Sequence, residues 1–303
     1  MVDFSKVKTY PLNSRKNKVE AKNFSSSDSN LLSKIIPDIL IGKDLKELVG
    51  KIREARRAKA PILWMIGAHV VKCGLGTLLI RLMDDGYVTH LATNGAAPIH
   101  DFELALIGET SEEVADGIKD GSFGMAQETG ELINRIINSD PERGLGESFG
   151  RTILEGNFPH KSLSVFANAV KNNIPVTVHS AIGTEIIQMH PLYDYAQQSK
   201  KTYADFLRMV ETVSVLNDQS VVLNIGSGVM LPEVFLRSLN ISRNLCTKAY
   251  GFTTAVFDME RLFRPYENIT HRPTQEGGKG YYFVGQHEVM IPLLYWLLVK
   301  EGI

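Results

Sequence analysis

The sequence has few cysteines, no excess of either charge and no long apolar run. Its 303 residues include only Cys73 and Cys246, so it lacks the paired cysteines of a disulfide-stabilised secreted domain. The net charge of −1 disfavours a dedicated nucleic-acid or membrane-surface binder, because both need a basic excess. No apolar run reaches the roughly 18 residues of a membrane span, and the first residues lack an apolar signal region. We therefore predict a soluble cytoplasmic protein that binds neither nucleic acid nor membranes.

The composition is that of a globular α/β protein. Hydrophobic residues make up 44% of the chain and charged residues 22%, and the length suffices for one large domain. Residues 1–30 are rich in lysine and arginine and poor in aliphatic residues, which predicts an N-terminal arm. Residues 31–303 contain no repeat and no break in composition, so they are predicted to form a single α/β domain.

Short apolar runs alternate with helical periodicity from residue 31 onward. The predicted strands are 61–66, 88–93, 175–179, 221–225, 251–257 and 281–284. The predicted helices are 45–58, 75–83, 101–120, 122–138, 161–172, 206–215 and 289–300. Trp64 and Trp296 fall in a predicted strand and helix and are expected in the core. This alternation predicts a parallel sheet with helices on both faces.

In such a sheet, ligands bind where the loops converge at the carboxyl ends of the strands. Four loops that follow predicted strands are therefore candidates, at 67–74, 93–103, 179–185 and 224–233. Their small residues let backbone N–H groups approach a phosphate or ribose. Asp101 in the second loop is either a ligand contact or the cap of a helix.

A glycine-rich segment, 272–280, precedes the last predicted strand and contains Lys279. It is not a nucleotide-binding P-loop, because the spacing and the trailing Ser or Thr are missing. A lysine that is desolvated there could form an imine with a carbonyl compound, whereas a solvated loop lysine would not.

Taken together, these segments resemble the deoxyhypusine synthase family over roughly residues 60–300. The matching segments, in order, are the loop that ends at Gly74, the turn Thr93-Asn94-Gly95-Ala96, the strand at Ile174-Pro175-Val176 with Ser180 and Glu185 after it, the turn Gly226-Ser227-Gly228, the pair Thr254-Ala255 and the helix at Pro292-Leu293-Leu294. The resemblance implies a Rossmann-like NAD-binding fold and the NAD-dependent transfer of an aminoalkyl group from an amine to a protein lysine. It also implies a homotetramer.

The resemblance further implies a set of site residues. Lys279 would carry the imine, Glu185 with Glu276 or Glu288 would hold the cationic amine, and His287 or His100 would move protons. The implied NAD contacts are His69, Gly74, Thr93, Asn94, Gly95, Asp101, Gly226, Ser227, Gly228, Thr254 and Ala255.

The segments that hold the polyamine in that family are altered here. Its histidine pair is replaced by Leu231-Pro232-Glu233, its acidic Gly-Ser-Asp-Ser segment has no counterpart, and its Trp-Gly-Lys motif is reduced to Gly278-Lys279. With fewer acidic groups, spermidine is expected to be a poor substrate and a smaller or less charged amine a better one.

Two other functions are compatible with the same residues. A metal-dependent hydrolase would use the loop residues His69, His100, Asp101, His179 and His190, since histidine and carboxylate groups suit zinc or iron. A non-catalytic nucleotide-binding or regulatory protein would bind the nucleotide at the glycine turns and would not turn over an amine.

Overall fold

The computed structural model describes residues 31–300, which divide into two compact units. Residues 31–47 contain α1 (Leu32–Ile35) and the start of α2 (Leu40–Ala58), and the second unit begins at Leu48. The predicted N-terminal arm lies outside the described residues. The unit from Leu48 onward contains the sheet and all the loops predicted to bind ligands.

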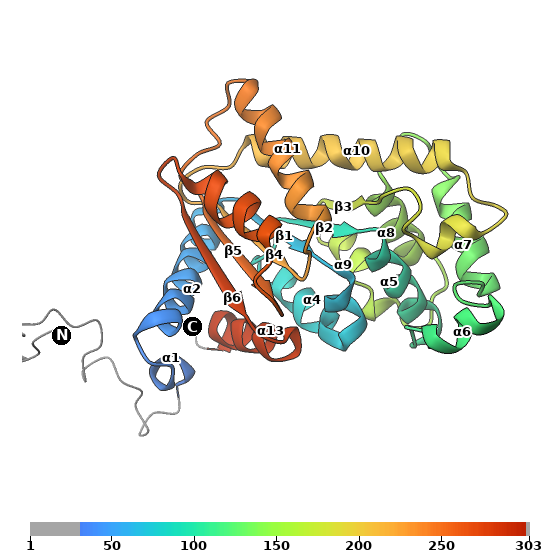
Figure 1. Ribbon diagram of the computed structural model, residues 1–303, viewed down its shortest axis with the longest axis horizontal. Helices are drawn as coiled ribbons and strands as arrows, with labels where there is room; N and C mark the ends of the chain where they lie inside the picture. Colours follow the sequence, from blue (N-terminus) through green and yellow to red (C-terminus); the bar gives the residue numbers. More distant parts are fainter. Residues whose placement is uncertain (1–30, 301–303) are drawn as a thin grey trace, which may run out of the picture. The chain divides into compact units, whose positions relative to one another are not determined.

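Six parallel strands form one sheet in the order β3-β2-β1-β4-β5-β6 (Figure 1). The strands are β1 (Ile62–Ile66), β2 (His90–Asn94), β3 (Val176–His179), β4 (Val221–Ile225), β5 (Thr253–Asp258) and β6 (Lys279–Val284). All six predicted strands are present, and β1, β3, β4 and β5 are buried along their whole length. Continuous burial explains why the sequence shows unbroken apolar runs, because a parallel strand covered on both faces has no polar side.

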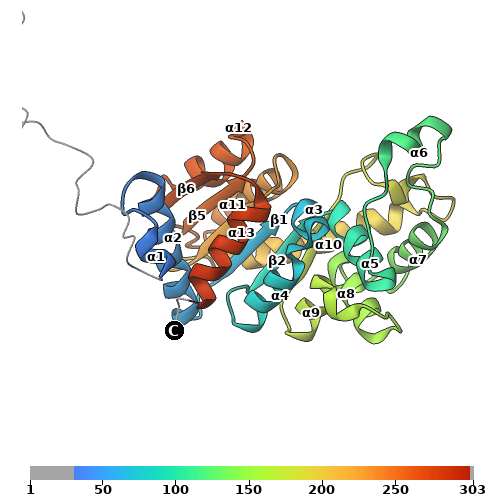
Figure 2. The same ribbon diagram turned by 90° about the horizontal axis from the view of Figure 1, so that it is seen from below.

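Helices cover both faces of the sheet, as predicted (Figure 2). The longer helices after α2 are α4 (Gly76–Asp84), α5 (Ala96–Ile107), α6 (Val114–Asp120), α7 (Gln127–Ile137), α8 (Leu145–Glu155), α9 (Val165–Lys171), α10 (Tyr195–Ser214), α11 (Met230–Asn244) and α13 (His287–Tyr295). The shorter helical segments are α3 (Ala68–Val70), η4 (Val71–Leu75), η5 (Lys161–Leu163), η6 (Ile186–Met189), α12 (Phe263–Pro265), η7 (Tyr266–His271), η8 (Arg272–Thr274) and η9 (Trp296–Lys300).

One predicted helix is divided in the structure. The pattern over 101–120 predicts one helix, whereas α5 ends at Ile107 and α6 begins at Val114. Gly108 adopts the left-handed conformation (φ +77°) that ends α5, and its N–H donates to the carbonyl of Leu104. A left-handed glycine after the last turn is a common helix terminator.

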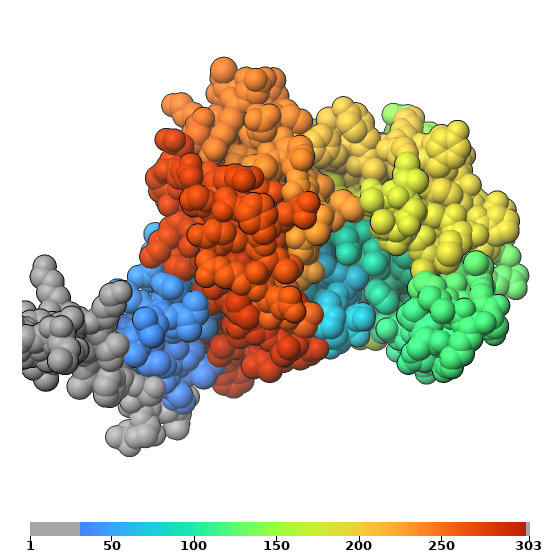
Figure 3. Space-filling model, in the orientation of Figure 1, coloured from blue at the N-terminus to red at the C-terminus, as the bar shows by residue number. Residues whose placement is uncertain are grey.

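The core on one face of the sheet lies between the strands and helices α10 and α11. Leu63 and Met65 of β1 and Val222 of β4 pack there against Met209 of α10 and Phe235 of α11. In the space-filling view these two helices lie side by side as adjoining yellow and orange surfaces (Figure 3).

The opposite face of the sheet is covered by other helices, α4, α9 and α13 among them. Trp64 of β1 is 1% exposed, and its indole Nε1 donates to the carbonyl of Tyr87 at 2.8 Å. The prediction that Trp296 is also core is wrong, because 47% of this residue is exposed. Among the described residues, no helix combines the length and apolarity needed to cross a membrane.

The core packing predicts a large difference between two phenylalanines. Phe235 is fully buried and Phe263 is 71% exposed. The Phe235→Ala substitution should lower the free energy of unfolding by about 3–5 kcal/mol, because it leaves a cavity in the core. The matched Phe263→Ala substitution should change it by no more than about 0.5 kcal/mol. Urea unfolding of the two variants measures both values, and equal destabilisation would contradict the assigned core.

Candidate functional site

The turns after β1 and β4 touch at the centre of the sheet. The N–H of Gly67 donates to the carbonyl of Ile225 at 2.8 Å, and that of Gly226 to the carbonyl of Phe257 at 2.9 Å. A Cβ on Gly67 would lie 2.1 Å from the carbonyl oxygen of Gly226, so only glycine fits there. The chain leaves β1 toward β2 and β4 toward β5, in opposite directions. This is the topological switch point at which open parallel sheets bind ligands.

His287 closes the site from the β5 side. It is the first residue of α13 and 1% exposed, and its ring lies about 3.0 Å from where a Cβ of Gly226 would be. Its Nε2 lies 3.3 Å from the carbonyl oxygen of Phe257, so this nitrogen carries the proton and donates it. The other ring nitrogen, Nδ1, is buried and has no hydrogen-bond partner among the described residues.

Further buried polar atoms without a hydrogen-bond partner belong to residues at the ends of β4 and β5. Within residues 31–300 they include Asn224 Oδ1 near the end of β4 and Asp258 Oδ2 at the end of β5. The amide nitrogen of Asn224 donates to the carbonyl of Ser227, and Asp258 Oδ1 accepts from the N–H of Met259. Unsatisfied buried polar atoms are rare in native proteins. Their position beside the glycine turns identifies this edge as the candidate site.

A cluster of His69, Cys73 and Glu288 lies at the same edge. His69 Nε2 is 3.1 Å from the sulfur of Cys73 and 3.3 Å from Glu288 Oε1. Burial, followed by the hydrogen bond with Glu288, raises the pKa of the Cys73 thiol. The ring of His69 lies against that of His287, with 5.4 Å between the centroids.

Glu185 lies beside the turn after β2. A Cβ on Gly95 would lie 2.2 Å from Glu185 Oε1, so the carboxylate rests on the glycine backbone. The hydroxyl of Thr184 donates to Glu185 Oε1 at 3.1 Å. Burial raises the pKa of Glu185, which is 9% exposed. An adjoining pocket of about 370 Å³ is lined by Phe123, Ile182, Thr184, Glu185, Met189 and Tyr193, among others.

The structure brings many of the predicted site residues to this edge. They are His69 and Gly74 after β1, Asn94 and Gly95 at the end of β2, Glu185 after β3, Gly226, Ser227 and Gly228 after β4, and His287 at the start of α13. Thr93, the residue before Asn94, is buried within β2, and its hydroxyl is directed to the carbonyl of Thr177. Figure 3 shows a recess here, with a cyan and teal floor between orange-red and yellow segments.

Some predicted residues already have structural partners. The Ser227 hydroxyl accepts the N–H of Leu231 in the first turn of α11, and Asn94 Oδ1 accepts the N–H of Ala97 in α5. Both side chains therefore stabilise helix starts, so what they offer a ligand is mainly backbone.

Asp101 has a structural role in place of the predicted cofactor contact. It is fully buried in α5, where it accepts the hydroxyl of Ser164 at 2.5 Å and the N–H of Val165 at 2.7 Å. The carboxylate thus binds the N-terminus of α9. Of the two roles that the sequence predicts for Asp101, the helix cap is closer to the structure. The helix that Asp101 caps is α9, however, and not α5, in which it lies.

Thr254, Ala255 and Lys279 lie away from the carboxyl ends of the strands. Thr254 and Ala255 are buried near the start of β5, paired in register with Val222 and Leu223. Lys279 is the first residue of β6 and is exposed, with its Nζ 4.9 Å from the centre of the Tyr281 ring. The glycine-rich segment precedes its strand, which places this lysine at the opposite end of the sheet from the glycine turns.

The structure does not assemble the five predicted metal ligands. His179 Nε2 is 3.1 Å from the hydroxyl of Thr177, and His100 Nδ1 is 2.8 Å from that of Thr110. His190 Nδ1 accepts the N–H of Leu192. Burial lowers the pKa of His179 to about 4 and keeps the ring neutral. Only His69 among the five joins other ligand-type side chains, and these partners, Cys73 and Glu288, are not in the predicted set.

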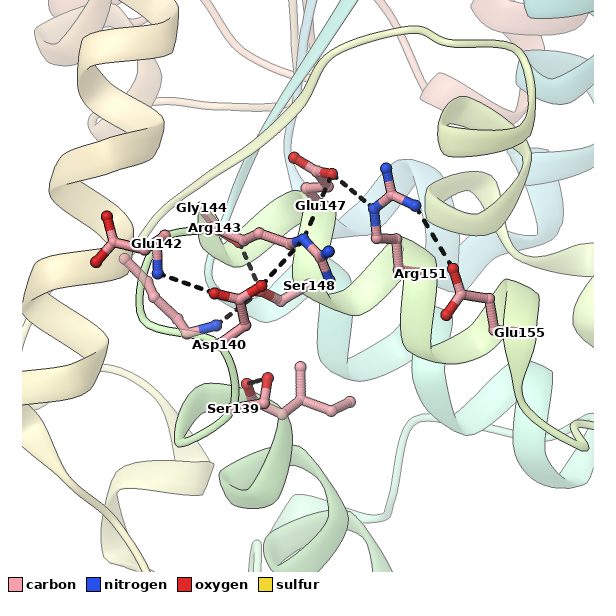
Figure 4. A network of polar contacts seen from close by, with 11 residues as sticks. Ser139, Asp140, Glu142, Arg143, Gly144, Glu147, Ser148, Arg151 and Glu155 are labelled. Atoms are coloured by element: carbon pink, nitrogen blue, oxygen red, sulfur yellow. Dashed lines mark hydrogen bonds and ion pairs between the residues drawn. The ribbon is translucent and has the colours of Figure 1, made fainter.

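A second pocket, of about 510 Å³, lies at the amino end of β3. Figure 4 shows part of its wall, where Arg143 contacts Asp140 and Glu147, and Arg151 contacts Glu147 and Glu155. Because these two arginines are shared among three carboxylates, both cations in this part of the wall are already paired. Its position at the amino ends of the strands also separates it from the switch point.

Comparison with known proteins identifies the fold. No family model and no curated protein matches the sequence. Similar solved structures include AgrE in complex with ornithine and NAD+ (18% identity, TM-score 0.57), a conserved protein assigned as LOR/SDH from Methanococcus maripaludis S2 (16%, 0.55) and a protein assigned as a deoxyhypusine synthase from Entamoeba histolytica (13%, 0.52). Each match covers 86% of this chain and respectively 33%, 70% and 88% of the other.

These similarities establish a Rossmann-like α/β fold that is shared with the three proteins. The fold class predicted from the sequence is thereby confirmed. The chain spans about a third of the length of the AgrE chain and of the cyanobacterial arginine dihydrolase ArgZ, which also shares the fold.

The burial of Asp101 predicts a pH dependence of stability. Burial raises its pKa from 3.8 to about 7, against the opposing hydrogen bonds from Ser164 and Val165. The folded state therefore binds more protons than the unfolded state between these values, so stability falls as the pH rises from about 4 to about 7. The contribution of this one group to the slope is at most about 1.4 kcal/mol per pH unit.

The Asp101→Asn substitution should remove that contribution. Urea unfolding between pH 4 and 8 (roughly the window set by the two pKa values) should give a shallower decline for this variant than for the parent chain. The exposed Asp218→Asn substitution is the control and should leave the profile unchanged. Parallel profiles for Asp101→Asn and the parent would show that Asp101 titrates normally in the folded state.

Proposed function

We propose that the chain binds NAD across the β1/β4 switch point and uses it to oxidise a small amine held beside Glu185. The observation that carries the proposal is the contact between Gly67 and Gly226, with unpartnered atoms of Asn224, Asp258 and His287 around it. Glycine turns at the switch point of a parallel sheet are where dinucleotide folds bind a phosphate or ribose.

The side chains at the turns suit the sugar and phosphate groups of a dinucleotide. Asp258 Oδ2 and Asn224 Oδ1 are acceptors without partners, as required to bind the hydroxyl groups of a ribose. Gly228 has only the flexible side chain of Leu262 near its missing Cβ, so its backbone remains accessible. The match to AgrE, whose structure holds NAD+ and ornithine, supports the same choice of cofactor.

Bound NAD would supply a hydride acceptor. The carbon that bears the protonated amino group would lose a hydride and the nitrogen a proton, which leaves a protonated imine, NADH and a released proton. Glu185 would hold the substrate as a cation by a charge-assisted hydrogen bond. Because burial raises its pKa, Glu185 gains from a cationic partner that restores its charge. Nδ1 of His287, which has no hydrogen-bond partner within residues 31–300, would accept the released proton.

The imine on Lys279 is not part of this proposal, because Lys279 lies at the amino end of β6. The same position favours the second candidate function, a nucleotide-binding protein that carries out no transfer. A protein lysine as acceptor and a homotetrameric assembly stay predictions from the family resemblance.

Replacing Gly228 should weaken NAD binding. In Gly228→Val, the new side chain meets only the end of Leu262 within the protein but fills the space above the turn. We expect the dissociation constant for NAD, measured by titration calorimetry, to rise by about tenfold or more, equivalent to about 1.4 kcal/mol. Gly50→Val, at a helix position with nothing within 4 Å of the added Cβ, is the matched control. Unchanged affinity in a folded Gly228→Val protein would refute this position for NAD.

Replacing Glu185 should weaken binding of the amine and leave the affinity for NAD unchanged. Glu185→Gln should raise the KM for the amine by about ten- to a hundredfold. This corresponds to the loss of one charge-assisted hydrogen bond, which contributes about 1.5–3 kcal/mol. NADH formation with small primary amines, agmatine, putrescine and spermidine gives the KM values, and NAD affinity is measured separately. Glu142→Gln, an exposed carboxylate paired with Lys200, is the control. NAD binding without turnover of any amine would favour the non-catalytic function.

A further inference from the structure

The cluster of His69, Cys73 and Glu288 has the composition and spacing of a metal site. The three side chains come from two segments, since His69 and Glu288 are 219 residues apart in the sequence. Their ligand-type atoms all lie within 4.8 Å of one another. His69 and Cys73 are four residues apart on consecutive helical turns, α3 and η4, which places them on the same side.

The contacts of His69 distinguish a metal site from a catalytic relay. In a relay the histidine uses one ring nitrogen for the nucleophile and the other for the acid. Here both Cys73 Sγ and Glu288 Oε1 contact the same nitrogen, Nε2, at 3.1 and 3.3 Å. One nitrogen has either one proton or one lone pair in its ring plane, so it does not serve both partners in a relay. Three donors that converge on a single point are what a cation requires.

Two of the three distances between these atoms are close to those around a tetrahedral ion, and the third lies within 4.8 Å. Zinc lies about 2.3 Å from sulfur and about 2.0–2.2 Å from nitrogen or oxygen, so its tetrahedral ligands are about 3.3–3.6 Å apart. The nitrogen–oxygen distance of 3.3 Å already fits, and the nitrogen–sulfur distance of 3.1 Å needs only a small adjustment.

The donor set also selects the metal. A thiol, an imidazole and a carboxylate together suit zinc and similar transition metals, whereas calcium and magnesium prefer oxygen ligands alone. The His69 and Glu288 side chains are 29% and 46% exposed, so a fourth position is open to water or a substrate. Three protein ligands and one open position are typical of a catalytic rather than a structural zinc site.

We propose that His69, Cys73 and Glu288 bind one divalent zinc-type ion at the edge of the β1/β4 site. The ion would lie next to the Gly67 turn and could hold a polar group of the substrate. This inference does not depend on NAD, because every ligand belongs to the chain.

Cobalt substitution tests the site. The full chain, with any affinity tag removed, is treated with a chelator and titrated with Co²⁺ in the absence of NAD and amine. We expect one equivalent to bind, with a sulfur-to-cobalt charge-transfer band in the near ultraviolet and the strong visible absorption of a four-coordinate ion. Competition by Zn²⁺ should abolish both bands. Absence of binding, or only the weak visible absorption of a six-coordinate ion, would overturn the proposal.

Variants identify the ligands. Cys73→Ser should lose the charge-transfer band, and His69→Ala and Glu288→Gln should each weaken Co²⁺ binding by about tenfold or more. Cys246→Ser is the matched control, because Cys246 is the other free cysteine and is exposed. Circular dichroism checks the fold, and Glu288→Gln, at an exposed position, decides the question if Cys73→Ser does not fold. An undiminished band in folded Cys73→Ser, or unchanged affinity in Glu288→Gln, would refute the assignment. Failure of NAD to bind would leave these results unaffected.

Discussion

The contact between the turns at Gly67 and Gly226 is the constraint on which the site depends. Adjacent parallel strands bring their carboxyl ends together. Here a Cβ on Gly67 would lie 2.1 Å from the carbonyl oxygen of Gly226, and a Cβ on Gly226 would lie about 3.0 Å from the ring of His287. Beside these turns, η4 packs against α13, and α3 contacts the start of α13 through His69 and Glu288. His69 thereby meets Glu288, and His287 closes the space beneath Gly226. One close backbone approach therefore brings together the proposed dinucleotide surface and the proposed metal site.

Buried polar groups separate structural residues from candidate functional ones. His90, Thr177 and His179 form a continuous chain of hydrogen bonds within the sheet, at 3.0 and 3.1 Å. Burial lowers the pKa of His90 to about 3, so this chain is neutral and satisfied. Asp258 and His287 differ, because each retains a buried atom without a partner in the described part of the chain. A histidine at a strand end is thus informative only once its partners are known.

The sheet could be predicted from the sequence, and the roles of many site residues could not. The central strands β1 and β4 are nearly continuous apolar runs, and burial on both faces makes such runs visible. The division of the 101–120 pattern depended on one left-handed glycine, Gly108. The partners of Asp101 are 63 and 64 residues away, and no local pattern reveals them. Asp258 was missed, although it directly follows a predicted strand. The spacing of His69 and Cys73 was visible in the sequence, but their third partner, Glu288, follows the last strand.

The direction of β6 limits the chemistry available within one chain. Lys279 and Val284 are its first and last residues, and five steps of about 3.3 Å separate them by about 17 Å. An extended lysine side chain reaches less than half of that distance, since it has only four methylene groups beyond Cα. An electrophile formed at the glycine turns therefore lies beyond its reach. Proton transfer and substrate binding at that edge must come from residues already there, and within residues 31–300 the ionisable groups at that edge include Glu185, Asp258, His287 and the cluster around His69.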